Sequence, residues 1–214
     1  GRCLSTCPLG LIKAQDKHLD FQEIAPLIAE LQPDAIEIHT APGRKKEFQE
    51  TVEAIVSSKV HFQRVAVSCG IEGHKINAEE LAQELWDRFS CLRQNKLKPL
   101  WQLDGRRMSG DIGIGTAKVA VDLWQKVHAL APPGPLQIAG GTNAQTIKYI
   151  PNRKGPSGIA FGSMARKTIQ PWLIKAEANK TNLRDWPEGW QSALKEAKQL
   201  INPWLLDNCK PKIC

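Results

Sequence analysis

PLQIAGGT, residues 135–142, is a short apolar run that ends in small and polar residues. Four other runs share this character: DAIEIHT (34–40), RVAVSCG (64–70), KPLWQLDG (98–105) and SGIAFGS (157–163). A run of this length that is bounded by glycine or polar residues is typical of a buried β-strand. The sequence therefore predicts five strands, and their arrangement decides the fold class.

Amphipathic patterns with a helical period lie between and beside these runs. They cover residues 20–31, 44–58, 78–94, 115–130, 143–150 and 187–201. Asp20 and Asn143 are expected to cap two of these helices, because their side-chain oxygens can accept from free backbone amides at a helix start. Strands that alternate with single helices predict a parallel sheet whose strands follow chain order.

Parallel strands of nearly continuous apolar character are expected to be covered on both faces, as in an open doubly wound sheet or an eight-stranded barrel. AGGTN (139–143) and FGSMAR (161–166) favour the barrel, because barrels bind phosphate with the loops after their last two strands. We therefore predict an α/β fold that forms the last five βα units of a TIM-barrel-like (βα)8 domain. The expected domains are the end of a ferredoxin-like segment (1–15), the barrel-like part (16–170) and a helical C-terminal extension with a tail (171–214).

Cys3 and Cys7, which is followed by proline, match the second half of a bacterial iron–sulfur run, Cys-x2-Cys-x2-Cys-x3-Cys-Pro. The match predicts that both are ligands of a 4Fe–4S cluster, that further ligands lie outside this sequence, and that a cysteine precedes Gly1. A disulfide is the alternative that the spacing leaves open, because the sequence has six cysteines. The first 30 residues lack a basic segment followed by an apolar run, so we expect reduced thiols in a cytosol-like compartment.

Composition and charge limit the kinds of partner that we expect for this chain. The chain has 214 residues, of which 42% are hydrophobic, and a net charge of +7. Its lysines and arginines are interspersed with acids rather than gathered in blocks, so a nucleic-acid partner is not expected. No apolar stretch reaches the length of a membrane span, so we expect no membrane partner.

The loop DGRRMSGDIGIGT (104–116) is the first candidate site. Asp104, Arg107 and Asp111 lie in it, and its glycines can bring backbone amides close to an anion. With His39, which ends an earlier strand, these three residues are the candidate catalytic groups. The alternative is a tight turn in which Asp104 pairs with Arg107. Cys69 is expected to be a small buried residue rather than a nucleophile.

A second candidate site lies where the last two strands end. Two helix starts with free amides are expected to meet there and to bind a phosphate-containing ligand such as FMN. The predicted binding residues are Gly140, Gly141, Thr142, Asn143, Gly162, Ser163 and Arg166. The alternative is that the glycines only allow a strand and a helix to pack closely.

WQLDGRRMSGDIGIGT (101–116) is the most specific string of the chain. Together with Cys3 and Cys7, DAIEIHT, AGGTN and GSMAR, it resembles the C-terminal part of the light-dependent-period A (LdpA) iron–sulfur proteins of the cyanobacterial circadian system. The resemblance extends from residue 1 to about residue 170. It assigns Cys3 and Cys7 to the third and fourth cysteines of the second cluster motif.

The resemblance implies a redox-sensing regulatory protein that modulates circadian period in response to light or redox state. It also implies clock or redox-signalling proteins as partners, and the cyanobacterial cytoplasm or the plastid stroma as the location. The residues at the strand ends leave a second function open, a flavin- or phosphate-binding barrel oxidoreductase that receives electrons from the clusters. Whether the chain is an enzyme therefore stays open at this point.

Overall fold

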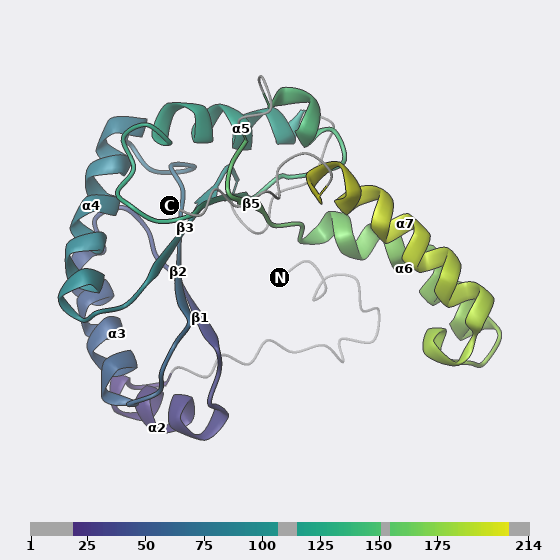
Figure 1. The fold of residues 1–214 in the computed structure, drawn as a ribbon, viewed down its shortest axis with the longest axis horizontal. Coiled ribbons are helices and arrows are strands. Elements are labelled where there is room, and N and C mark those ends of the chain that lie inside the picture. The colour runs from purple at the N-terminus through teal and green to yellow at the C-terminus, as the bar shows by residue number, and fades with distance from the viewer. Residues whose placement is uncertain (1–18, 107–114, 151–154, 206–214) are drawn as a thin grey trace, which may run out of the picture.

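The computed structural model describes residues 19–106, 115–150 and 155–205 (Figure 1). Five parallel strands form one sheet in the order β1-β2-β3-β4-β5. They are β1 (Ala35–His39), β2 (Arg64–Cys69), β3 (Pro99–Asp104), β4 (Leu136–Ala139) and β5 (Gly158–Ile159). The predicted strands and their chain order are confirmed.

Six α-helices accompany the sheet in the described part of the chain. They are α2 (Phe21–Leu31), α3 (Lys45–Ser57), α4 (Ala78–Gln94), α5 (Thr116–Val127), α6 (Ser163–Ala178) and α7 (Pro187–Leu205). Asp20 is the N-cap of α2, as predicted, and its backbone N–H donates to Glu23 Oε2 at 2.9 Å. In these described ranges, no helix is long and apolar enough to span a lipid bilayer.

The α-helix predicted over residues 143–150 is wrong. Only a 3₁₀ helix, η1 (Thr146–Tyr149), forms there. Asn143 Oδ1 accepts from the backbone N–H of Gln145 at 2.8 Å, and the N–H of Asn143 donates to Thr146 Oγ1 at 2.9 Å. These side-chain bonds hold a turn that competes with a helix. Ile150 is extended, which is the conformation that the following proline favours.

Helix α6 begins where we expected a helix, directly after Gly162, and continues from Ser163 to Ala178, through Pro171. It therefore crosses the predicted boundary between residues 170 and 171. Helices α6 and α7 lie side by side and extend away from the sheet (Figure 1), and the ring of Trp204 near the end of α7 contacts Phe161 at 6.5 Å between centroids.

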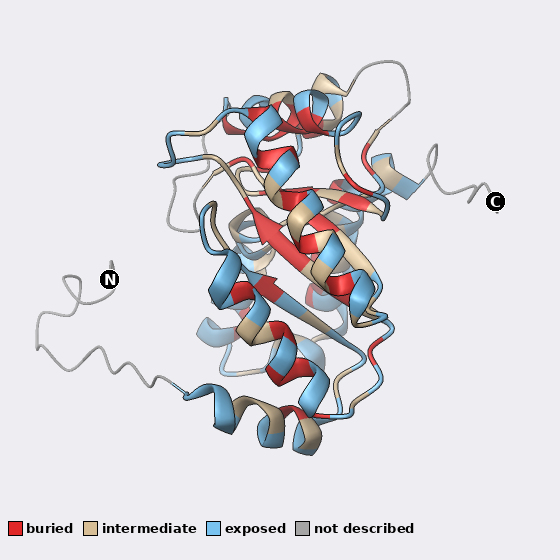
Figure 2. Ribbon diagram, turned by 90° about the vertical axis from the view of Figure 1, so that its left-hand side faces the viewer, coloured by how far each residue is buried: buried red, intermediate tan, exposed pale blue. Residues whose placement is uncertain are grey.

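The two faces of the sheet differ. Helices α2 to α5 cover one face, which Figure 1 shows as the outer side of a curved sheet. Val67, Trp101 and Leu103 lie on this face, fully buried in the main apolar cluster. Figure 2 shows buried stretches, in red, both on the strands and on the helices that cover them. The opposite face carries polar side chains from β1 to β4. The interpretation of the strands as nearly continuous apolar runs is therefore wrong, because apolar and polar side chains alternate along β1 to β4, although Ser68 and Gln102 on the polar face are buried.

Candidate functional site

The polar face of the sheet, defined by Glu37, Ser68, Gln102 and Gln137, carries a row of hydrogen bonds. Gln102 Nε2 donates to Glu37 Oε1 at 2.7 Å and to Ser68 Oγ at 3.1 Å. Gln137 Nε2 donates to Gln102 Oε1 at 2.5 Å. The strand register places Ser68, Gln102 and Gln137 side by side. The row therefore joins β1, β2, β3 and β4 through side chains.

Asp104 is the last residue of β3, and its carboxylate is hydrogen-bonded to side chains of this row. Ser68 Oγ donates to Asp104 Oδ2 at 2.5 Å, and Gln102 Nε2 lies 3.5 Å from Oδ1. Burial raises the pKa of Asp104 above its ordinary value of 3.8, and the charge of Glu37 raises it further. The hydrogen bond from Ser68 and the charge of His39 act in the opposite direction. The dominance of burial means that Asp104 holds a proton more tightly than an exposed aspartate does.

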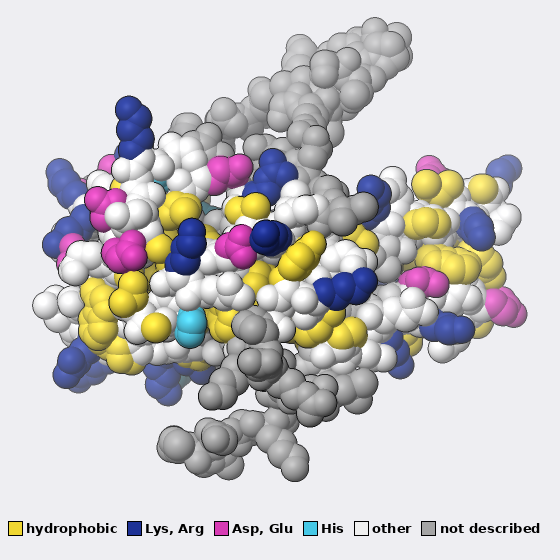
Figure 3. Space-filling view, turned by 90° about the horizontal axis from the view of Figure 1, so that it is seen from above, with side chains coloured by type: hydrophobic (Ala, Val, Ile, Leu, Met, Phe, Trp, Pro, Cys, Tyr) yellow, Lys and Arg dark blue, Asp and Glu magenta, His cyan; other side chains and the backbone are white. Residues whose placement is uncertain are grey.

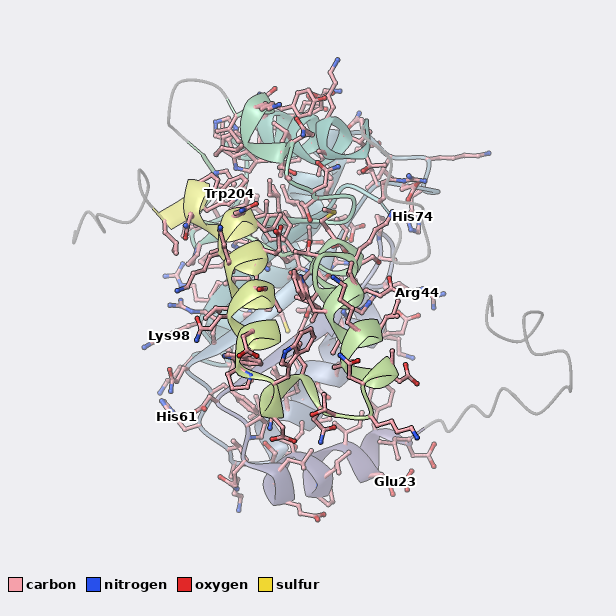
Figure 4. The ribbon with its side chains drawn as sticks, turned by 90° about the vertical axis from the view of Figure 1, so that its right-hand side faces the viewer. Glu23, Arg44, His61, His74, Lys98 and Trp204 are labelled. Carbon is pink, nitrogen blue, oxygen red and sulfur yellow. The ribbon has the colours of Figure 1, made fainter. Side chains whose placement is uncertain are left out.

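A cavity of about 120 Å³ opens at the carboxyl ends of β1, β2 and β3. It is lined by Thr40, Gly70, Glu72, His74, Asp104 and Arg106. Arg106 Nε lies 3.6 Å from Glu72 Oε1, so an acid and a base of the lining are paired. Figure 4 shows His74 on one side of the molecule, and His61 and Lys98, which precede β2 and β3, on the other. The cavity thus lies where parallel α/β folds usually bind ligands.

Arg88 on α4 is bonded to the loop that follows β1. Its side chain is 1% exposed and lies 5.5 Å from the centre of the Phe48 ring. Nη1 contacts Glu84 Oε2 at 2.5 Å, and Nη2 donates to the carbonyl oxygen of Ala41 at 2.8 Å. Because Ala41 follows Thr40, Arg88 holds the loop that brings Thr40 to the cavity.

Arg88 and Gln137 were both absent from the predicted site. Arg88 stands at helical spacing from Leu81, Leu85 and Leu92, which are fully buried. A single charged residue on an apolar helix face could have identified Arg88 as a buried, paired side chain. Gln137 interrupts the apolar run of its strand, and its place in the alternation of β4 could have identified it as part of the polar face.

Two of the four candidate catalytic residues, Asp104 and His39, lie in the described part of the chain. Asp104 lies at the cavity and in the hydrogen-bonded row. His39 Nε2 is 3.4 Å from Glu37 Oε1, and both side chains are more than one third exposed. Arg107 and Asp111 lie outside the described residues, as does the predicted contact between Asp104 and Arg107.

The glycines after β4 make close backbone contacts. Gly140 and Gly141 have φ angles of +66° and +94°. A Cβ atom on Gly140 would lie 2.5 Å from the carbonyl oxygen of Arg106, and one on Gly141 would lie 3.1 Å from the Thr116 side chain. This geometry favours the packing explanation for both glycines.

The two loops of the predicted anion corner are adjacent, as expected from the sheet order. Thr142 Oγ1 donates to the carbonyl oxygen of Ala160 at 2.5 Å, and Thr142 and Asn143 are buried. We predicted that both loops lead into α-helices. This prediction is wrong for the first loop, which leads into the short 3₁₀ helix η1. Only the second loop opens an α-helix.

Gly162 is the N-cap of that helix, α6. No atom lies within 4 Å of a Cβ built on Gly162, so space is open there. Arg166 Nη2 donates to Ser163 Oγ at 3.2 Å on the exposed surface. The binding roles of these three residues stay a prediction.

The described cysteines do not resemble metal ligands. Burial raises the pKa of the Cys69 thiol to about 11, and Cys69 lies on the helix-covered face of β2. This confirms the expectation of a buried residue. Burial also raises the pKa of Cys91 on α4. Within residues 19–106, 115–150 and 155–205, no cluster of His, Cys, Asp and Glu side chains is arranged to hold a metal ion. Cys3 and Cys7 lie outside these ranges.

The fold and the site define a parallel α/β protein with a polar cavity at the carboxyl ends of its strands. The chain belongs to the light dependent period A C-terminal domain family, whose model matches residues 27–203. It is 37% identical over 211 residues to the protein named Light dependent period A of Synechococcus elongatus. That match covers 95% of this chain and 58% of the relative, so the chain spans less than two thirds of the relative's length. No solved structure matches the chain significantly.

Proposed function

We propose that this chain is the C-terminal regulatory domain of an iron–sulfur protein that senses redox state and modulates circadian period in response to light. Its own contribution is the binding of a small polar ligand in the cavity at Asp104. Family membership and the name of the Synechococcus relative support the light-dependent role. Clock or redox-signalling proteins are the partners that this role requires.

The observation that carries the proposal is that Asp104 belongs both to the cavity and to the hydrogen-bonded row. A ligand that donates to Asp104 competes with Ser68 for the same carboxylate. Ser68 also accepts from Gln102, which in turn accepts from Gln137. Ligand binding therefore changes hydrogen bonds that reach as far as β4, which is how a domain of this kind can report occupancy.

The described groups favour binding over nucleophilic catalysis. A catalytic serine must present its hydroxyl to the substrate and pass its proton to a base. The Ser68 hydroxyl donates to Asp104 and accepts from Gln102, so it is held within the hydrogen-bonded row, and the imidazole of His39 contacts Glu37. Cys69 keeps its proton at neutral pH because burial raises its pKa to about 11.

The iron–sulfur part of the proposal concerns residues outside the described ranges. Cys69 and Cys91 do not fit a cluster, because burial favours their protonated thiols and a cluster needs thiolates. We therefore assign the ligand role to Cys3 and Cys7, together with cysteines from outside this sequence. A longer family protein that contains this chain should show iron–sulfur absorption and EPR signals when it is purified without oxygen. The Cys7→Ser variant should lose part of the iron, and an unchanged iron content would refute the assignment.

An oxidoreductase that binds flavin or phosphate at the corner of Gly140, Gly141 and Gly162 is the second candidate. The open space at Gly162 is the observation that favours it. Calorimetry with FMN and with inorganic phosphate tests it. Heat of binding, or thermal stabilisation at millimolar ligand, would support this candidate, and a lack of both would remove it.

The regulatory proposal is tested with a hybrid protein, in which this chain replaces the matching region of the Synechococcus relative. The hybrid should restore the light dependence of circadian period in cells that lack the relative. Asp104→Asn should impair restoration while the hybrid accumulates normally, and Asp122→Asn, a change on α5 outside the cavity lining, should not. Restoration that is equal with both variants would refute a role for the cavity.

A further inference from the structure

Strand β1 forms one edge of the sheet. The backbone N–H of Thr40 donates to the carbonyl oxygen of Ser68 on β2 at 3.0 Å. Backbone groups of successive residues in a strand point to opposite sides. The N–H and C=O groups of Glu37 and His39 therefore point away from β2, toward the open edge. Such an edge is a template for another strand.

Helix α2, next to this edge, is apolar on more than one side. Eight of its 11 residues, FQEIAPLIAEL, are apolar. Ile28 is buried and Ile24 packs against the core, whereas Leu27 and Leu31 remain 40% and 66% exposed. Helices that are apolar all round are normally buried on all sides. The flank formed by Leu27 and Leu31 is thus an uncovered packing surface.

The order of the elements along the chain indicates which kind of structure would cover this flank of α2. Helix α2 packs against α3 in the helix layer and leads directly into β1. In Figure 4, Glu23 in the first turn of α2 lies on the same side of the molecule as His74, which is the side of the strand carboxyl ends. The chain therefore enters α2 at the point where a preceding parallel strand would end. A right-handed crossover through α2 would place that strand beside β1.

Space is also available at this edge. A cavity of about 410 Å³ lies at the end of β1 and the start of α3. Ile38 and Phe48 contribute apolar walls to it, and Arg44 and Glu47 form its rim. A cavity at the end of an edge strand is expected where a neighbouring βα unit is absent.

We propose that the edge of β1 and the Leu27–Leu31 flank of α2 bind a βα unit from the part of the longer family protein that precedes this domain. The strand of that unit pairs in parallel with β1, and a helix packs on Leu27 and Leu31. The family is described as a C-terminal domain, and this chain covers 58% of the Synechococcus relative, so that relative contains additional sequence that can supply the unit. The inference rests on family membership and is independent of the ligand at Asp104. It also supplies a way for the sheet to continue toward a barrel, as the sequence predicted.

Hydrogen exchange at single backbone amides tests the proposed pairing. The measurement compares this chain alone with the hybrid that carries the remainder of the Synechococcus relative. The amides of Glu37 and His39 should exchange at least about tenfold more slowly in the hybrid, because an added strand protects them. The amide of Thr40, already bonded to Ser68, is the internal control and should be slow in both proteins. Equal rates at Glu37 and His39 would overturn the proposal.

Thermal unfolding tests the helix flank. Leu31→Glu should lower the melting temperature of the hybrid by at least about 5 °C and should leave this chain alone nearly unchanged. Val119→Glu is the matched control, since Val119 is an apolar residue on α5 that is 49% exposed. It should have little effect in either protein. Equal effects of the two variants in the hybrid would refute the docking site. Concentration-dependent protection of Glu37 and His39 in this chain alone would show instead that a second copy occupies the edge.

Discussion

Replacing Gly140 with alanine tests whether this glycine serves packing or ligand binding. Its φ angle is +66°, where a side chain costs about 1–2 kcal/mol. The new Cβ atom would also lie 2.5 Å from the carbonyl oxygen and 2.8 Å from the nitrogen of Arg106. These are backbone atoms, which cannot rotate away, so overpacking adds roughly 1–3 kcal/mol. The total loss of unfolding free energy is therefore about 2–5 kcal/mol.

The assay is urea and thermal denaturation followed by circular dichroism. At about 2–4 °C per kcal/mol for a chain of this size, Gly140→Ala should lower the melting temperature by roughly 4–20 °C. Gly115→Ala is the control. Gly115 has φ −80° and no atom within 4 Å of a built Cβ, so its effect should stay within about 0.5 kcal/mol.

Equal stability of Gly140→Ala and the wild type would refute the packing argument. If millimolar phosphate stabilised the wild type but not a folded Gly140→Ala protein, we would conclude instead that this loop binds an anion. Loss of stability without any phosphate effect is the outcome that the structure predicts.

Three further predictions concern titratable groups. Because the folded pKa of Asp104 is raised, the stabilisation from its proton is complete below pH 3.8 and is lost as the pH rises through the folded pKa. Asp104→Asn should therefore flatten the fall of the urea midpoint as the pH rises above 3.8, and parallel curves would contradict this. In a variant that keeps only Cys69 and Cys91, a thiol reagent at pH 8 should label Cys91 first and Cys69 only on unfolding; equal rates would show that Cys69 is accessible. Arg88→Met should cost roughly 3 kcal/mol in a denaturant titration, because the partly buried carboxylate of Glu84 and the carbonyl oxygen of Ala41 both lose their donor. Exposed Arg93→Met should cost almost nothing, and equal losses would show that Arg88 contributes no more than a surface charge.

Local features of the sequence were sufficient for most of the fold. Each strand was predicted because its apolar run lies between turn residues, and α4 was predicted from Ala78 to Gln94 as observed. Its start is marked by Asn77, which forms a reciprocal capping box with Glu80. The error at residues 143–150 arose because Asn143 and Thr146 bond to nearby backbone, which a helical apolar pattern does not reveal.

The sequence by itself determined that the chain is a parallel α/β protein of the light dependent period A family. It also placed Asp104 at the end of a strand. Strand pattern, chain order and the crossover rule are all properties of short segments, so they can be read along the chain.

Only the tertiary structure decided what surrounds Asp104. Gln102 reaches Glu37 across 65 positions of sequence, Ser68 reaches Asp104 across 36, and Arg88 reaches Ala41 across 47. Such partners depend on strand register and on which helix covers which face. These follow from the packing of the whole chain, because burial and hydrogen bonding of each side chain depend on neighbours that only folding brings together.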